Sequence, residues 1–291
     1  MVENVRLHEL VAVAHRNRAY YDEFVSYLDA CGYASVHAFV NERRAARALK
    51  VIRGFLERKP SCPLYDGGGD PYSAQKAAWY FMGWLFRDAA SQRLEPLVRQ
   101  MPGDTVTARR AELLNRVRMF VRPIFPEPEC WEWTPLREVM IQRLEGSRRA
   151  KRGSALETVV RGVLSVLVRP PLTVEPGQVR LQDQTYDVQV TGPGGVLLLP
   201  VKTRETMGGG HASLFTRDIS ESIAVASAAG YHCLPVVIAE SWAAPLEGLA
   251  CDEYVYVALN PNQAGEVKRQ LRRVLVDRLA RLMPLLASSE G

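Results

Sequence analysis

The sequence has few cysteines, and none of them lies in a metal-binding or disulfide pattern. The five cysteines are scattered, odd in number and without a CxxC pair, which argues against a disulfide framework and against structural zinc. The five histidines form neither an HExxH motif nor a Cys/His cluster. We therefore expect reduced thiols, and oxygen ligands for any metal that binds.

The sequence also lacks long apolar runs. The longest one, residues 196–201, is far shorter than the roughly 20 residues that a membrane helix needs. The opening segment MVENVRLHELVAVAHRNR mixes charged and apolar residues, whereas a signal peptide needs an uninterrupted apolar region. We expect a cytoplasmic protein with no membrane partner.

The overall composition is that of a globular protein. With 47% hydrophobic and 24% charged residues, 291 residues can form one large domain or two ordinary ones. The net charge is +5 and the pI is near 9.0. This balance slightly favours an anionic partner such as nucleic acid.

In the first half of the chain, apolar residues recur with helical spacing. Gly32 and Pro60 follow two of the predicted helices, and Thr134 with Pro135 precedes the last one. The expected helices are residues 7–30, 36–57, 74–99, 107–121 and 135–144. The first domain, residues 1–146, is therefore predicted to be a helical module that binds DNA, forms a dimer interface, or does both.

After the basic run at residues 148–152 the pattern changes. Helices are expected over residues 154–167, 215–229 and 265–286, and strands over 172–174, 179–181, 186–190, 196–203, 234–240 and 254–259. The basic residues of the closing helix lie opposite its apolar stripe, which favours a helix packed on the core. Short antiparallel strands followed by a helical crossover predict an α/β domain of the α+β type, residues 147–291, with a mixed sheet flanked by helices.

Residues 185–205 contain candidate catalytic residues. Period-two alternation places Asp187 and Gln189 on one face of their strand, and places Pro200 and Lys202 on one face of the next. Between the strands, residues 191–195 (TGPGG) supply a hairpin reversal. Asp187 and Lys202 are therefore expected to meet at one end of a bent hairpin.

This pair of groups suits phosphodiester hydrolysis. A carboxylate holds Mg²⁺, which polarises the phosphate and lowers the pKa of a bound water, while a nearby ammonium orients that water and steadies the developing charge. Mg²⁺ prefers oxygen ligands and retains several waters.

Residues 153–240 resemble the PD-(D/E)XK nuclease superfamily, and the whole chain resembles a type II restriction endonuclease. The matching positions are Glu157 on a helix, Asp187 in the first hairpin strand and Lys202 in the second. The resemblance implies a restriction-endonuclease-like fold and Mg²⁺-dependent cleavage of double-stranded DNA by a homodimer, in a restriction-modification role. Asp187 would hold the metal and Lys202 would orient the water.

The sequence departs from the family pattern at Pro200, which stands where the triplet should begin with an acid. Proline can neither bind the metal nor donate a ladder hydrogen bond. Asp218, in the helix after Lys202, or Glu157 could complete the ligand set. Alternatives are a repair or structure-selective nuclease on the same core, and a DNA-binding protein with a degenerate site.

Some of these residues also have purely structural explanations. Ser154 to Glu157 reads as a capping box, and Asp218 could stabilise a helix N-terminus. Around the glycine run after the lysine strand, the residues predicted to contact DNA are Arg204, Gly209, Gly210, His211 and Arg217. Their structural alternatives are a flexible connector and solvated surface charge.

Overall fold

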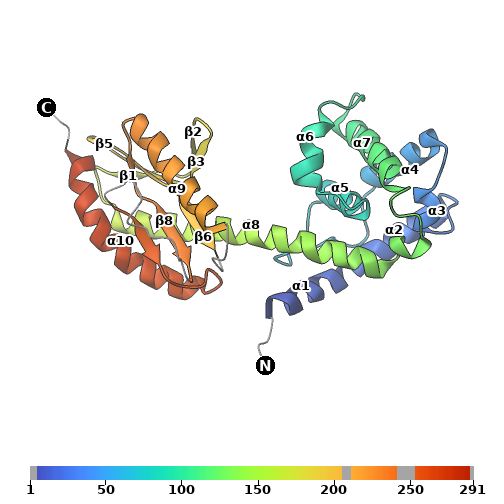
Figure 1. Ribbon diagram of the computed structural model, residues 1–291, viewed down its shortest axis with the longest axis horizontal. Helices are drawn as coiled ribbons and strands as arrows, with labels where there is room; N and C mark the ends of the chain where they lie inside the picture. Colours follow the sequence, from blue (N-terminus) through green and yellow to red (C-terminus); the bar gives the residue numbers. More distant parts are fainter. Residues whose placement is uncertain (1–4, 205–210, 241–252, 289–291) are drawn as a thin grey trace. The chain divides into compact units, whose positions relative to one another are not determined.

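The computed structural model describes residues 5–204, 211–240 and 253–288. The chain divides into two compact units, Met1–Arg149 and Ala150–Gly291, whose elements are labelled in Figure 1. The boundary expected from the sequence was between residues 146 and 147. The described elements of the first unit are helical, and the second unit is mixed α/β.

The first unit is a helical domain with an aromatic core. Tyr20, Phe24, Phe39, Phe55 and Phe81 pack against one another, mostly in edge-to-face or tilted pairs. Its helices are α1 (Val5–Arg16), α2 (Arg18–Ala30), α3 (Val36–Val40), α4 (Ala45–Glu57), α5 (Ala74–Leu85), the π-helical η1 (Ala90–Leu94), α6 (Glu95–Val98), α7 (Val106–Val121), the 3₁₀ helix η2 (Pro128–Trp131) and the first part of α8 (Trp133–Leu167).

Two of the predicted helices are broken. The helix expected over residues 36–57 stops at Asn41, because the buried Arg118 guanidinium of α7 takes the carbonyls of Val40 (2.6 Å) and Glu42 (3.0 Å). The helix expected over residues 74–99 is interrupted at Arg87, whose φ of 62° is left-handed. In both places tertiary contacts or backbone geometry override the periodicity that the sequence shows.

Two other helices that the sequence predicts separately form a single continuous helix. Residues 135–144 and 154–167 both lie within α8, which runs for 35 residues. The intervening segment contains two glycines but no proline, and glycine costs only about 1 kcal/mol in a helix interior. The capping-box explanation of Glu157 is therefore wrong, because Ser154 lies inside the helix, where its carbonyl accepts from Thr158 Oγ1 at 3.0 Å.

A mixed sheet forms the centre of the second unit. Strand β4 (Val188–Gly192) pairs antiparallel with β1 (Thr173–Val174) and β5 (Gly195–Leu199), and β5 pairs parallel with β7 (His232–Cys233). A further set, β6 (Val201–Arg204), β8 (Val236–Ala239) and β9 (Val255–Val257), is parallel throughout. A separate hairpin consists of β2 (Val179–Leu181) and β3 (Gln184–Tyr186).

Pro200 divides a single bent strand into β5 and β6. Proline has no N–H for the ladder, yet its carbonyl accepts from Val236 N at 3.0 Å, and the Leu198 carbonyl accepts from Leu234 N at 2.9 Å. These bonds continue the parallel pairing across the interruption. The predicted strand over residues 196–203 is thus present with one break.

Helices cover both faces of this sheet (Figure 1). Apolar residues of α8 and α10 (Ala264–Ala287) pack with Val188, Val190 and Leu197 on one face. On the opposite face, α9 (His211–Ala228) packs Phe215, Ile219 and Ile223 against β8, and Ala226 against Leu198. The mixed α/β class and the packing of the last helix on the core are confirmed.

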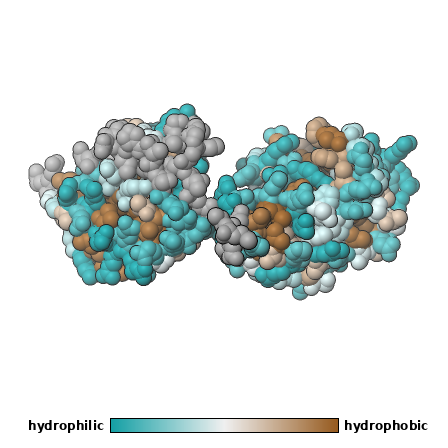
Figure 2. All heavy atoms as spheres, turned by 60° about the horizontal axis from the view of Figure 1, so that its bottom comes forward, coloured by the Kyte–Doolittle hydropathy of each residue, from teal (hydrophilic) through white to brown (hydrophobic). Residues whose placement is uncertain are grey.

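Hydrophilic side chains cover most of each unit on the face drawn in Figure 2, and apolar side chains show as separate patches. Among the described residues, no helix has both the length and the apolar character needed to cross a membrane.

Candidate functional site

Asp187 directly precedes β4, where the hairpin pairing begins. The β4–β5 register starts with Val188 opposite Leu199. The Asp187 amide donates to the Leu199 carbonyl at 3.1 Å. The amide of Val201, the residue after Pro200, donates to Asp187 Oδ2 at 2.7 Å. The backbone of the second hairpin strand thus holds the carboxylate in place.

Lys202 lies on the face of the sheet that α9 covers, where it pairs with Asp218. Strand alternation is interrupted at Asp187, because Tyr186 packs on the α9 side whereas Val188 packs with α8 and α10 on the opposite side. The Lys202 ammonium is close enough to lower the pKa of Asp187. Gln189 itself donates to Thr191 Oγ1 at 2.9 Å instead of joining the site.

Glu157 reaches the same place from α8. The Gln178 carboxamide nitrogen donates to Glu157 Oε2 and to Asp187 Oδ1, both at 3.0 Å. Gln178 directly precedes β2. Arg161, one helical turn after Glu157, donates from Nη2 to the Asp187 carbonyl at 2.5 Å. Two carboxylates are therefore held side by side, linked by one neutral amide.

Both carboxylates are held in an environment that disfavours their charged forms. Asp187 is only 9% exposed, and this burial raises its pKa despite the Val201 N–H and the Lys202 ammonium, which lower it. Burial, and then the nearby charge of Asp187, raise the pKa of Glu157. Such a pair is stabilised by an added cation, because the cation favours both ionised forms.

Asp218 pairs with Lys202. Its Oδ2 accepts from the Lys202 ammonium at 3.0 Å, and its side chain is more than half exposed. Helix α9 is held over the hairpin by Tyr186, whose hydroxyl donates to the Ser222 carbonyl at 2.6 Å, and by Ser222, which donates to Gln184. Burial raises the pKa of Tyr186 to about 12, so this anchor stays neutral.

The donor set fits a magnesium ion with two carboxylate ligands. Mg²⁺ is usually held by one or two carboxylates and keeps several waters, and Asp187 with Glu157 meets that requirement. No group of three or more His, Cys, Asp or Glu residues within the described part of the chain could hold a metal. The three acids expected from the sequence thus do not converge, since Asp218 is turned to Lys202.

The predicted DNA-contacting residues have separate outcomes. The guanidinium of Arg204, at the end of β6, lies 5.3 Å from the centre of the Phe215 ring. Arg217 is exposed on α9. Gly209 and Gly210 lie outside the described residues; His211 begins α9, but its side chain is not described.

Sequence reasoning missed Gln178 and Arg161. Gln178 precedes a short hairpin and matches no motif, so its contact with both acids depends on how that hairpin folds back. Arg161 follows Glu157 by four residues on one helix, a spacing that could have identified it as a neighbour. Its Nε–H is buried without a hydrogen-bond partner among the described residues.

Comparisons with family models, with curated proteins and with solved structures found no match for this chain.

Proposed function

We propose that this protein is a Mg²⁺-dependent endonuclease that hydrolyses phosphodiester bonds of double-stranded DNA, with a restriction-endonuclease-like core and the role of a sequence-specific type II restriction enzyme. One observation carries the proposal: the buried Asp187 and Glu157 carboxylates lie together, with raised pKa values, beside the Lys202 ammonium. A homodimer and a cytoplasmic location belong to the same proposal, and rest on the resemblance and on the sequence.

The residues of the site have distinct roles in this proposal. When bound, Mg²⁺ would polarise the scissile phosphate and offset its negative charge. Asp187 and Glu157 would hold the ion, and the Val201 amide and Gln178 keep the two carboxylates in place. Lys202 would orient the attacking water and stabilise charge that develops on the phosphate. Asp218 positions the Lys202 ammonium through their ion pair.

Cleavage of plasmid and phage DNA in the presence of Mg²⁺ tests the proposal. We expect discrete fragments from the wild-type protein, and a rate lower by about 100-fold or more for Asp187→Ala and Lys202→Ala. Asp183→Ala and Lys268→Ala, on exposed side chains of the same unit, should leave the rate unchanged. Smeared products would favour the repair or structure-selective nuclease instead.

A DNA-binding protein with a degenerate site is the second candidate. Two observations favour it: Pro200 stands in place of an acid, and the Lys202 ammonium is engaged in an ion pair with Asp218. Intact DNA at every Mg²⁺ concentration, together with salt-sensitive binding, would select this candidate and contradict the nuclease.

A further inference from the structure

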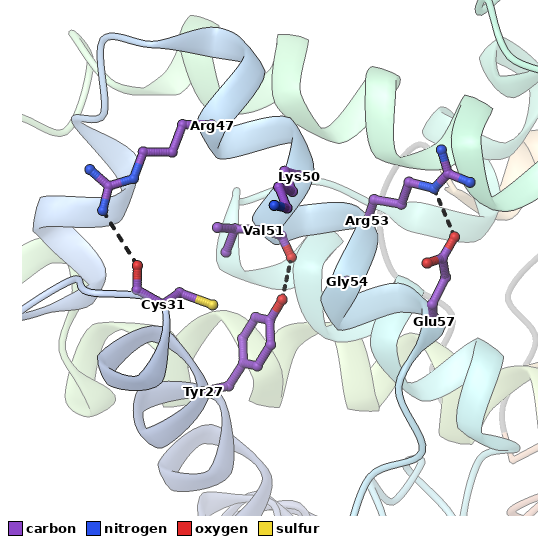
Figure 3. A pocket seen from close by; sticks show the side chains of 8 residues that line it. All are labelled: Tyr27, Cys31, Arg47, Lys50, Val51, Arg53, Gly54 and Glu57. Carbon is purple, nitrogen blue, oxygen red and sulfur yellow. Dashed lines mark hydrogen bonds and ion pairs between the residues drawn. The ribbon is translucent and has the colours of Figure 1, made fainter.

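A groove opens on the surface of the first unit between α2 and α4. Its volume is about 510 Å³, within the range of small-ligand sites. Figure 3 shows Tyr27 and Cys31 on the α2 side and Arg47, Lys50 and Arg53 along α4. Apart from Glu57 at one end, the charged residues that line the groove are basic.

The floor of the groove is fixed. The Tyr27 hydroxyl donates to the Val51 carbonyl at 2.8 Å, and burial raises the pKa of Tyr27, so the phenol stays neutral. Gly54 allows this approach, because a Cβ there would lie 2.6 Å from the hydroxyl. This contact joins α2 to α4 at the floor of the groove.

The segment that carries the groove is strongly basic. Residues 43–59 contain seven basic side chains and one acidic, a net charge of +6, against +5 for all 291 residues. Glu42 and Glu23, which face this segment through Arg47 and Arg58, reduce that excess to +4. Lys50 is exposed and has no acidic partner among the described residues, and the Arg53–Glu57 pair is about half exposed.

The distribution of this charge favours an extended polyanion. Basic residues continue past both ends of α4, with Arg43 and Arg44 before it and Arg58 and Lys59 after it. The 13 residues of α4 span about 20 Å, at 1.5 Å per residue. A single nucleotide would fill the groove without reaching the flanking Arg43 and Lys59, whereas a DNA backbone supplies a phosphate every 3.4 Å of each strand.

We propose that the α2–α4 groove binds the phosphate backbone of duplex DNA, with Lys50 and Arg53 as phosphate contacts. DNA is taken as the polyanion because of the proposed function, on which this proposal rests. The groove would be the place where the first unit holds the substrate. Contacts of this kind position a duplex without reading its sequence.

Binding to a labelled duplex of about 30 base pairs, measured by fluorescence anisotropy in EDTA over a salt series, tests the site on the full chain. We expect the slope of log affinity against log salt to fall by about two units for Lys50→Gln/Arg53→Gln, since each phosphate contact contributes about 0.9. Arg47 is left unchanged because it also contacts Glu42 and the Cys31 carbonyl. The control is Arg272→Gln/Arg273→Gln, which removes the same charge from exposed positions of α10.

Cys31 gives a second readout without any substitution. Its thiol lines the groove, whereas Cys130 lies elsewhere in the same unit and serves as the internal standard. We expect bound duplex to slow alkylation of Cys31 several-fold relative to Cys130, as measured by peptide mass spectrometry.

Equal loss of binding in the two double variants, or equal protection of the two thiols, would overturn the groove as a DNA site. Competition by millimolar inorganic phosphate or mononucleotide, with no salt-dependent duplex binding, would also overturn it and would indicate a small-anion site. None of these outcomes requires cleavage. If the results exclude the groove as a DNA site but Mg²⁺-dependent cleavage is observed, the proposed nuclease function stands. If the duplex binds in the groove but is never cut, only the proposed nuclease function is contradicted.

Discussion

Gln178 is a residue whose neutrality is essential to the candidate site. Its amide donates to two carboxylates whose pKa values are already raised by burial. In Gln178→Glu, a third carboxylate would replace both hydrogen bonds, and we expect a loss of about 1–3 kcal/mol of stability in EDTA. Because a divalent cation relieves that repulsion, Mn²⁺ should raise the melting temperature of this variant more than that of the wild type.

Differential scanning fluorimetry with and without Mn²⁺ measures both effects. Gln182→Glu, in the exposed β2–β3 turn of the same hairpin, is the matched control and should change neither. A Gln178→Glu protein as stable as the wild type in EDTA would show that the amide does not link the two acids.

At the residue scale the sequence predicts the types of side chain better than their contacts. Strand alternation predicts Asp187 and Lys202 on one face; in the structure the alternation is interrupted at Asp187, and what is shown is that the Lys202 ammonium lies close enough to lower the pKa of Asp187. The alternation does not reveal that Asp218 pairs with Lys202, since that ion pair depends on the position of α9 over the sheet. Nor does it reveal Gln178, whose contacts are tertiary.

At the scale of elements, Glu23 fastens α2 to the segment after α4. Its carboxylate accepts from Ser61 N, Ser61 Oγ, Cys62 N and Cys62 Sγ, and it pairs with Arg58 at 2.9 Å. Burial opposes ionisation, but these donors outweigh it and hold the pKa of Glu23 below its ordinary 4.5. Because the pKa of Glu23 is lower in the folded state than in the unfolded state, its ionised carboxylate stabilises the fold fully at pH values above the unfolded-state pKa. That contribution is lost as the pH falls through the folded-state pKa.

We therefore expect Glu23→Gln to cost about 1–3 kcal/mol at pH 7. The difference from the wild type should shrink as the pH falls below about 4.5. Urea unfolding at several pH values measures it. Glu57→Gln, in a half-exposed pair with Arg53, should cost less than about 1 kcal/mol at every pH, and a pH-independent loss in Glu23→Gln would contradict the role of its ionisation.

The boundaries of elements follow from local signals only where no distant group intervenes. Thr105 begins α7 as an N-cap, with its side chain accepting from Ala108 N, in agreement with the helix expected from residue 107. The break after α3 has no such local cause. It coincides with hydrogen bonds from Arg118 to the carbonyls of Val40 and Glu42, which lie 78 and 76 residues earlier in the sequence. The pattern between residues 144 and 154 is equally ambiguous, since glycines weaken a helix without ending it.

At the scale of the whole molecule, each unit has hydrophobic clusters of its own among the described residues. The cluster that contains Phe24 belongs to the first unit, and the largest cluster of the second unit contains Leu197. Helix α8 runs across the boundary between the two units. Chains of more than one domain often unfold in more than one step.

We therefore expect calorimetry to resolve two unfolding transitions. Phe24→Ala and Leu197→Ala each remove a fully buried side chain, at a cost of about 2–5 kcal/mol, and each should lower the temperature of one transition only. A single transition lowered by both substitutions would mean that the continuous backbone of α8 transmits unfolding from one core to the other. That outcome would make α8 the structural link between the groove of the first unit and the carboxylates of the second.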